Sequence, residues 1–418
     1  MTLETEMLAL GAAAKQASAK MRLTSGGARN DALSLMATEI RNAEQAILEA
    51  NAADMSAATE KGLSAAMLDR LKLDSARVAG IAKGLDEIAA LPDPVGAVDK
   101  SWTQPNGLQF SQVRVPIGVI GMIYESRPNV TADAGGLCIK SGNACVLRGG
   151  SESVRSNQAI HTALQAGLRA AELPEGAISL VQTTDRAAVG DMLRGLGGAI
   201  DIIIPRGGKG LVARVQEDAR VPVLAHLEGL NHSYIHADAD IEQAVKIIEN
   251  AKLRRTGVCG STETVLIDAQ IAASALPALA SKLEDRCEMR GDARACAILP
   301  NIALATDTDF ATEHLAAILN IAVVDGLQDA LGHIAKYGSG HTDAILTKDT
   351  EVANVFLNSV DSAIVLHNAS TQYADGGEFG FGAEIGIATG RLHARGPVGA
   401  QHLTSYKYQV RGTGQVRP

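Results

Sequence analysis

Short apolar runs that alternate with helix-like segments are the feature of this chain that most limits its fold. From Pro116 onward these runs are separated by glycine-rich turns and by helix-like segments such as 154–171 and 187–196. Such runs are typical of strands that are buried on both faces of a parallel sheet. The repeated strand–helix order therefore predicts an α/β protein with a doubly wound parallel sheet. The candidate strands are 117–123, 144–147, 178–181 and 200–204.

The sequence on either side of these runs predicts further helices and a second α/β unit. Residues 1 to about 90 place apolar side chains such as Leu33, Met36 and Ile40 at helical spacing, which indicates amphipathic helices. From residue 234 to about residue 367, a second series of strand-like and helix-like segments alternates. We therefore expect two α/β domains, which suits the length of the chain.

Two other segments are predicted to be exposed strands. Residues 107–115 alternate and look like an exposed strand pair, and residues 404–410 read as a last strand near the C-terminus. Both are partly apolar and unpaired in a linear reading, and exposed strand edges favour pairing with another chain. We therefore expect a homo-oligomer, a dimer or a tetramer, with these strands at the interface.

Composition and charge exclude several classes of protein. The 418 residues have a formal net charge of −9, so the basic surface that general nucleic-acid binding needs is not expected. The first 20 residues include Glu4, Glu6 and Lys15 and do not read as a signal peptide. No apolar run reaches the ~18–20 residues of a membrane span. Because the five cysteines are odd in number and scattered, we expect reduced thiols and a cytoplasmic location.

One cysteine lies in a glycine-rich turn between a helix-like run and a strand-like run, in the segment Arg254-Arg255-Thr256-Gly257-Val258-Cys259-Gly260. The two arginines and the free backbone N–H groups of the turn favour the thiolate, the reactive form of cysteine. Cysteine is also the strongest side-chain nucleophile at neutral pH. Cys259 is therefore the candidate nucleophile, with a buried structural thiol as the alternative. The two arginines are either a partner for an anionic substrate or a solvated helix end.

Two glycine-rich turns lie where a predicted strand meets a helix. The backbone N–H groups of such turns and the N-terminus of the following helix bind phosphate groups. Neither turn matches the Gly-x-Gly-x-x-Gly fingerprint or a complete P-loop, but each carries a cation. Together they predict a dinucleotide site. The candidate residues are Arg148, Gly149, Gly150, Ser151, Glu152, Pro205, Arg206, Gly207 and Gly208.

Arg127 and Asn129 follow the first buried strand of the predicted sheet. Open α/β sheets bind ligands beyond the carboxyl ends of their strands. The amide of Asn129 is a candidate donor to an oxyanion that develops during the reaction. The alternative is that Asn129 caps the helix that follows.

Several motifs resemble, in order along the chain, the landmarks of the aldehyde dehydrogenase superfamily. The acidic helix start at residues 238–245 is similar to the segment that precedes the nucleophile of that superfamily. The other matching motifs are Pro116-Ile117-Gly118-Val119, Ser141-Gly142-Asn143-Ala144-Cys145-Val146-Leu147-Arg148, Glu228-Gly229 and Gly257-Val258-Cys259.

More narrowly, several segments resemble the γ-glutamyl phosphate reductase family, and the resemblance covers nearly the whole chain. One departure is Gln372-Tyr373, where the family usually has Arg-Phe. The matching segments are Tyr124-Glu125-Ser126-Arg127-Pro128-Asn129-Val130-Thr131, His341-Thr342-Asp343-Ala344-Ile345, and residues 375–386 and 391–397.

The resemblance implies an aldehyde dehydrogenase-like α/β fold with a cofactor domain, a catalytic domain and a small β flap for oligomerisation. The NADPH-binding domain is expected to comprise residues 1–103 and 116–228, and the catalytic domain residues 229–367. Residues 368–399 are expected to return to the cofactor domain. Residues 104–115 and 400–418 are expected to supply the oligomerisation strands.

The resemblance also implies NADPH-dependent reduction of L-glutamate 5-phosphate to L-glutamate 5-semialdehyde with release of phosphate, the second step of proline biosynthesis from glutamate. Cys259 would form a thioester, and Asn129 with the Cys259 backbone N–H would hold the oxyanion. Arg148 lies where the superfamily has a ribose-binding cation, so NADPH is expected to be preferred over NADH. The kinase that makes the acyl phosphate, glutamate 5-kinase, is a possible transient partner. The expected substrate-binding residues are Arg127, Arg254, Arg255 and His341.

The alternative functions are a generic NAD(P)-dependent aldehyde dehydrogenase and a non-catalytic partner of the kinase. Glu228 matches the water-activating base of aldehyde-oxidising enzymes, which a phosphate-releasing reductase does not need. The intact Cys259 counts against a purely non-catalytic role. No metal is expected, because no histidine pairs with Cys287 and Cys296 at ligand spacing. The remaining candidates, which we interpret as structural, are His232, His236, Cys138 and Cys145.

Overall fold

The computed structural model describes residues 2–417, and the N-terminal block is helical, as predicted. Four of its five helices begin at a Ser, Thr or Asp whose side chain accepts a hydrogen bond from a backbone N–H of the first turn, which stabilises a helix start. Pro92 and Pro94 follow the last of them. The helices are α1 (Leu3–Met21), α2 (Gly26–Asn42), α3 (Glu44–Glu60), α4 (Ala65–Leu71) and α5 (Ser75–Ala90).

The predicted doubly wound sheet has four parallel strands in the order β5-β4-β3-β6. Helices α6 and α7 pack together on one face, and α1 and α8 pack together on the other. The four candidate strands are confirmed to within three residues at their ends. The strands are β3 (Val119–Tyr124), β4 (Ala144–Arg148), β5 (Ile178–Leu180) and β6 (Ile202–Arg206). The helices are α6 (Val130–Lys140), α7 (Val154–Ala170), α8 (Ala187–Leu193) and α9 (Lys209–Asp218), with short 3₁₀ turns at Ser151–Ser153 and Glu175–Ala177.

A second parallel sheet of seven strands, in the order β10-β9-β11-β8-β7-β12-β13, confirms the second α/β unit. Separate apolar clusters cover its two faces, one around Val265 and Ile267 and the other around Tyr234 and Leu266. The strands are β7 (Asn231–Ile235), β8 (Thr262–Asp268), β9 (Glu288–Gly291), β10 (Ala303–Leu304), β11 (Ile318–Val324), β12 (Thr342–Leu346) and β13 (Ile364–His367). The helices are α10 (Ile241–Leu253), α11 (Ala269–Leu283), α12 (Ala293–Ile298), α13 (Asp307–Phe310), α14 (Leu327–Tyr337) and α15 (Thr350–Ser359).

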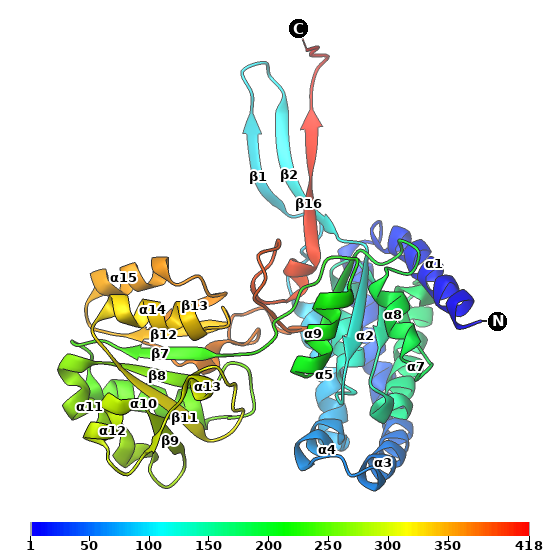
Figure 1. Ribbon diagram of the computed structural model, residues 1–418. Coiled ribbons are helices and arrows are strands. Elements are labelled where there is room, and N and C mark those ends of the chain that lie inside the picture. The colour runs from blue at the N-terminus through cyan, green and yellow to red at the C-terminus, as the bar shows by residue number, and fades with distance from the viewer. Residues whose placement is uncertain (1, 418) are drawn as a thin grey trace.

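A three-stranded antiparallel sheet projects away from both of these units (Figure 1). It consists of β1 (Val98–Thr103), β2 (Gln109–Pro116) and β16 (Thr404–Arg411). The expectation of a strand pair within residues 107–115 is corrected, because β2 is a single strand that pairs with β1. No alternation marks β1 in the sequence, since all of its residues are exposed.

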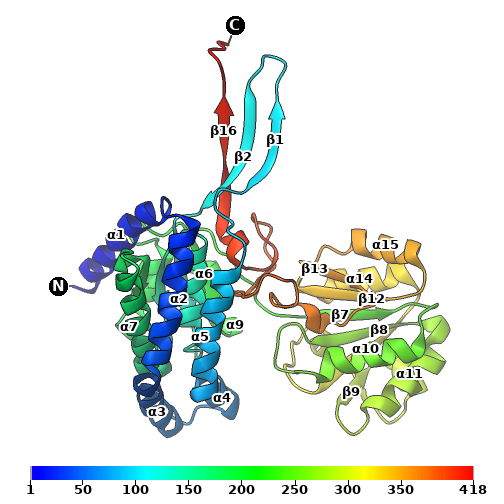
Figure 2. The same ribbon diagram turned by 180° about the vertical axis from the view of Figure 1, so that it is seen from behind.

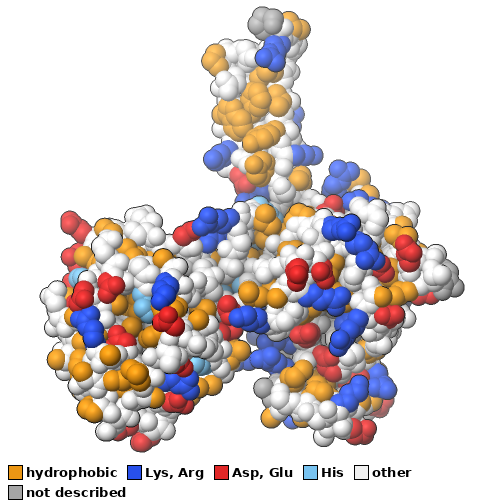
Figure 3. Space-filling view, viewed as in Figure 1, with side chains coloured by type: hydrophobic (Ala, Val, Ile, Leu, Met, Phe, Trp, Pro, Cys, Tyr) orange, Lys and Arg blue, Asp and Glu red, His pale blue; other side chains and the backbone are white. Residues whose placement is uncertain are grey.

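The projecting sheet carries an exposed apolar face (Figure 3). Trp102 stacks on Phe110 with ring centroids 5.3 Å apart, and Tyr408 meets the Trp102 ring edge-on at 6.0 Å. Val410, which is on β16 with Tyr408 and pairs with Phe110, is half exposed. This face suits association with a second copy of the chain, and that association stays a prediction.

The chain between β13 and β16 lies between the two units (Figure 2). Ile385, Ala394 and Val398 join the apolar cluster of the first unit, whereas Ala374 packs beside Ile364 and Cys259. The short elements here are β14 (Ile387–Ala388), β15 (Gly396–Pro397) and 3₁₀ turns at Thr371–Tyr373 and Ala400–Leu403. The proposed domain boundaries stay a prediction. None of the described helices is both long and apolar enough to cross a membrane.

Candidate active site

Cys259 lies in the loop between α10 and β8, at the amino end of that strand. The side chain of Asn231 fixes this loop, since its Nδ2 donates to the carbonyl oxygens of Cys259 at 2.6 Å and Ser261 at 2.8 Å. Gly229 packs against the same carbonyl, and a Cβ at that position would lie 2.1 Å from the Cys259 oxygen. The loop therefore has one tightly defined position, and it leaves the Cys259 side chain half-buried.

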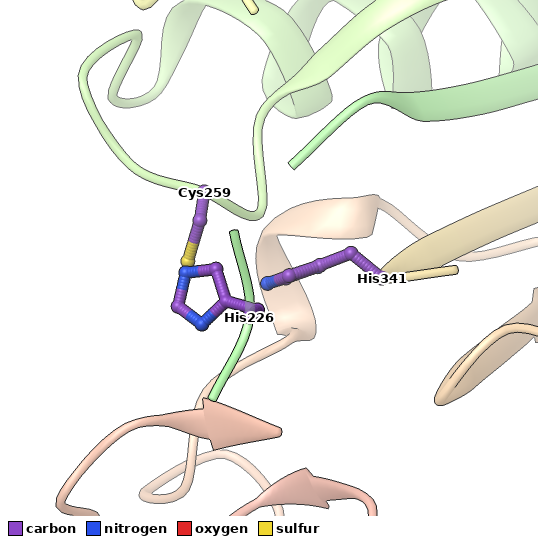
Figure 4. Close-up of side chains that lie close together, drawn as sticks. All are labelled: His226, Cys259 and His341. Carbon is purple, nitrogen blue, oxygen red and sulfur yellow. The ribbon is translucent and has the colours of Figure 1, made fainter. Parts of the chain in front are cut away.

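Two histidines lie beside the Cys259 sulfur (Figure 4). The Sγ atom and one ring nitrogen each from His226 and His341 all lie within 4.8 Å of one another. His226 Nδ1 is 2.8 Å from the carbonyl oxygen of Ile387. Since a carbonyl only accepts, we assign the proton to Nδ1, which leaves Nε2 for the cysteine. His341 is fully buried, with Nδ1 2.8 Å from Thr342 Oγ1.

The histidines change the acidity of the thiol. Burial raises the pKa of Cys259. The charges of His341 and His226 and their hydrogen bonds to the sulfur outweigh this effect and hold the pKa well below its usual value. Burial lowers the pKa of His226, yet the hydrogen bond and charge of Cys259 and the Ile387 carbonyl raise it above its usual value. The arrangement therefore favours a thiolate beside an imidazolium, as activated cysteines require.

We expect iodoacetamide to alkylate Cys259 at pH values well below about 8.5, the ordinary pKa of a cysteine thiol. The thiolate is lost only as the pH falls through the lowered pKa, so the rate should stay high into the acidic range. In His226→Asn the inflection should move upward by at least about one pH unit, because the raised pKa of His226 depends on Cys259 and their coupling is mutual. The rate is measured by mass spectrometry across pH.

His236→Asn is the matched control. His236 follows the carboxyl end of β7, whereas Cys259 lies at the amino ends of the strands, and its ring lies 2.6 Å from Asp238. Its alkylation profile should match that of the unmodified protein. Equal inflections in all of these proteins would contradict a role for His226 in forming the thiolate.

A cavity of about 490 Å³ contains Arg127 and Asn129 together with Arg255, so the structure brings these sequence-predicted residues together. Asn129 precedes α6, but its side chain makes no capping hydrogen bond. Instead its Nδ2 donates to Asp133 Oδ2 at 2.8 Å. The capping alternative therefore has no hydrogen bond to support it. Burial and the neighbouring arginines lower the pKa of Arg127 to about 10, and the charge of Cys259 partly opposes this shift.

Arg254 is not among the residues that line this cavity. Its guanidinium lies 3.5 Å from Gln372 Oε1. Gln372 in turn donates to the carbonyl oxygens of Ala251 at 3.0 Å and Arg255 at 3.1 Å. These bonds give partners to one carbonyl in the last turn of α10 and to one in the loop that follows it. The Gln at this position therefore supports the cysteine loop.

A cavity of about 450 Å³ at the carboxyl ends of β3 and β4 contains the candidate cofactor residues Arg148, Gly150, Ser151 and Glu152. Arg186 and Arg214, which were not predicted from the sequence, line it too. Three guanidinium groups around one cavity suit the phosphates of a dinucleotide. Gly149 lies against α7, where a Cβ would come within 2.0 Å of Asn157 Nδ2.

The second glycine-rich turn is not part of this cavity lining, although α9, which follows it, contributes Gly210 and Arg214. Glu125 Oε2 accepts a hydrogen bond of 3.0 Å from the Gly208 backbone N–H, so a carboxylate of the chain itself sits at the N-terminus of α9. The other residues of this turn, Pro205, Arg206 and Gly207, are also outside the cavity lining. The structure thus joins only the first turn and α9 to one site.

Glu228 and the remaining candidates have partners of their own. The carboxylate of Glu228 forms an ion pair of 2.6 Å with Lys209. His232 is buried and lies 3.0 Å from Asp343, which agrees with a structural role. Among residues 2–417, the metal-ligating side chains that gather in a group of three are those of His226, Cys259 and His341.

The site thus lies between the carboxyl ends of β3 and β4 and the amino ends of β7, β8 and β12. His226 was not predicted from the sequence, and it lies in a segment with no regular structure two residues before the Glu228-Gly229 motif. The signal that was available is its proximity in sequence to that motif.

Comparison with known proteins shows which family the chain resembles. A sequence model of the aldehyde dehydrogenase family matches residues 4–306. The γ-glutamyl phosphate reductase of Hyphomonas neptunium is 61% identical over 99% of this chain and 96% of its own length. That of Caulobacter vibrioides is 59% identical over 99% of this chain and 100% of its own length.

A solved structure gives the same result. The crystal structure of γ-glutamyl phosphate reductase from Thermotoga maritima superposes with a TM-score of 0.97 at 41% identity, covering 99% of this chain and 100% of that one. The resemblance and the fold class predicted from the sequence are therefore confirmed. This chain belongs to the aldehyde dehydrogenase family and, within it, to the γ-glutamyl phosphate reductases.

Proposed function

We propose that the protein reduces L-glutamate 5-phosphate to L-glutamate 5-semialdehyde, with release of phosphate and with NADPH as reductant, as the second step of proline biosynthesis. The relatives are named γ-glutamyl phosphate reductases, which supports a reductase role, and the family implies a nicotinamide cofactor. The observation that carries the proposal is the thiol of Cys259 beside His226 and His341.

The residues suit an acyl transfer to sulfur. Nε2 of His226 takes the thiol proton, and the Cys259 thiolate attacks the carbonyl carbon of the acyl phosphate. The Cys259 backbone N–H and the second N–H of the Asn129 amide hold the oxyanion while the bond to the phosphate oxygen breaks. Arg127 offsets the charge of the departing phosphate. A thioester on Cys259 results.

The first glycine-rich turn and the arginines that line the cavity beside it, Arg148, Arg186 and Arg214, would hold the cofactor. When bound, it supplies the hydride that reduces the thioester carbonyl. Asn129 again stabilises the oxyanion of the thiohemiacetal. As the carbon–sulfur bond breaks, the aldehyde leaves and His226 stabilises the returning thiolate.

The test is reduction of NADP by glutamate semialdehyde in the presence and absence of inorganic phosphate. We expect turnover to require phosphate, because phosphate is the acyl acceptor in this direction. A generic aldehyde dehydrogenase would instead transfer the acyl group to water and need no phosphate. The ion pair between Glu228 and Lys209 favours the first outcome, since it neutralises the carboxylate that would activate water. Equal turnover in the presence and absence of phosphate would overturn the proposal. Absence of any turnover would favour the non-catalytic alternative.

NADPH should be preferred over NADH, because a 2′-phosphate gains most from the guanidinium groups of its cavity. In Arg148→Met, kcat/KM for NADPH should fall by about 10- to 100-fold, the loss of one charge-assisted hydrogen bond. The value for NADH should change little. Arg155→Met is the matched control, since Arg155 lies on α7, outside the cavity lining, and pairs with Asp54 at 3.4 Å. An equal loss with both cofactors would contradict this role for Arg148.

A further inference from the structure

The cavity that holds Asn129 has charges of both signs, and among these the steps above use only that of Arg127. It lies among α4, α5, the start of α6 and the cysteine loop. Five cationic side chains line it, Arg70, Lys72, Arg77, Arg127 and Arg255. Two carboxylates line it as well, Asp69 and Asp133. A site for phosphate alone has no need of a carboxylate.

Part of this charge is neutralised within the chain. Arg77 pairs with Asp69 at 2.8 Å and donates to the Lys72 carbonyl oxygen at 2.8 Å, so this pair fixes the connection between α4 and α5. Within residues 2–417, the guanidinium groups of Arg70, Arg127 and Arg255 make no ion pair and no hydrogen bond. Together with the exposed Lys72 ammonium, which also forms no ion pair among the described residues, these three cations are left for a ligand.

Asp133 is the carboxylate that is left for a ligand. One of its oxygens, Oδ2, accepts from Asn129, and within the described residues the carboxylate forms no ion pair. Its Oδ1 lies beside Gly84 of α5, where an added Cβ would lie 3.9 Å away, so the residue at that position contributes no side chain to cover the oxygen. Burial raises the pKa of Asp133 to about 6, although Asn129 and Arg206 oppose the shift. A cation beside it would offset this cost of burial.

We propose that this cavity binds the α-amino-acid head group of the substrate, with Asp133 accepting from the α-ammonium group and Arg70 and Arg255 donating to the α-carboxylate. Arg127, which lines the same cavity, is then left for the acyl phosphate end. The assignment rests on the proposed function, and it makes Asp133 a determinant of substrate specificity in addition to a support for Asn129.

Binding of L-glutamate and of glutarate, which lacks only the amino group, tests the subsite without turnover. By calorimetry on the whole protein, L-glutamate should bind about 10- to 100-fold more tightly, the contribution of one charge-assisted hydrogen bond. Asp133→Asn should remove this preference. Arg70→Gln should weaken both ligands and keep the preference, because both carry the carboxylate that Arg70 binds.

Asp69→Asn is the matched control, since it removes a carboxylate from the same cavity that is already paired with Arg77. It should keep the full preference for L-glutamate. Equal binding of both ligands to the unmodified protein, or an unchanged preference in Asp133→Asn with a normal melting curve, would overturn the subsite. Either result would leave the proposed function intact, because phosphate-dependent turnover tests that function separately.

Discussion

Cys259→Ala should abolish turnover and leave NADPH binding largely unchanged. The thiolate makes the covalent bond to substrate, and no other side chain in this site can replace it. Loss of a nucleophile of this kind lowers turnover by at least ~10⁴-fold. The cofactor cavity is lined by other residues, so its affinity should remain. Turnover is measured by NADPH oxidation with the acyl phosphate, and cofactor affinity by fluorescence titration.

Cys287→Ala and Cys296→Ala are the controls. Burial raises the pKa of Cys287 to about 11, so at neutral pH its thiol is protonated and unreactive. Cys296 lies at α12, where its Sγ is 3.4 Å from the Gly291 carbonyl oxygen. Both variants should keep normal turnover per folded molecule. Residual activity in Cys259→Ala, or inactivation that follows alkylation of another cysteine, would show that the nucleophile lies elsewhere.

The fold was predictable from the sequence wherever burial imposes a pattern. The strands of the first sheet are continuous apolar runs because helices cover both faces. β1 was missed for the opposite reason. All of its residues are exposed in the single chain, so burial within the chain imposes no alternation of apolar and polar side chains, and only pairing with β2 makes it a strand.

The candidate site was predictable where one short segment contains both the reactive residue and its neighbours, as at Cys259. His226 could not be found in this way. Its position depends on the Ile387 carbonyl, which comes from a distant part of the chain. The rule that ligands bind beyond the carboxyl ends of parallel strands holds for the first sheet but not for the second. In the second sheet, Cys259 and His341 lie at the amino ends of β8 and β12.

The second glycine-rich turn shows a limit of motif reasoning. The sequence presents Gly207 and Gly208 as a phosphate site, but the carboxylate of Glu125 already accepts from the Gly208 N–H. Nothing near Glu125 in the sequence predicts this contact, since the two segments meet only because β3 and β6 are neighbours in the sheet. Competition between charged groups for one site is a property of the folded chain.

Asn129→Ala should slow the chemistry far more than it weakens binding. Asp133 holds one N–H of the Asn129 amide at 2.8 Å, which fixes the amide and leaves its second N–H as a donor. The oxygen that this donor serves carries full negative charge only in the tetrahedral species, so the loss belongs to the transition state. Removing one such donor typically costs about 10²–10³ in turnover.

The capping alternative predicts a different result, a stability loss of ~1 kcal/mol with near-normal turnover of the folded fraction. The missing capping bond makes a loss of that size unexpected. Single-turnover rates per folded molecule, taken together with a melting curve, distinguish the two. If Asn129→Ala melts at a lower temperature while its folded fraction reacts at the normal rate, Asn129 stabilises α6 and the oxyanion is held by other donors. If the rate falls and the melting temperature does not, the amide of Asn129 acts on the reacting oxygen.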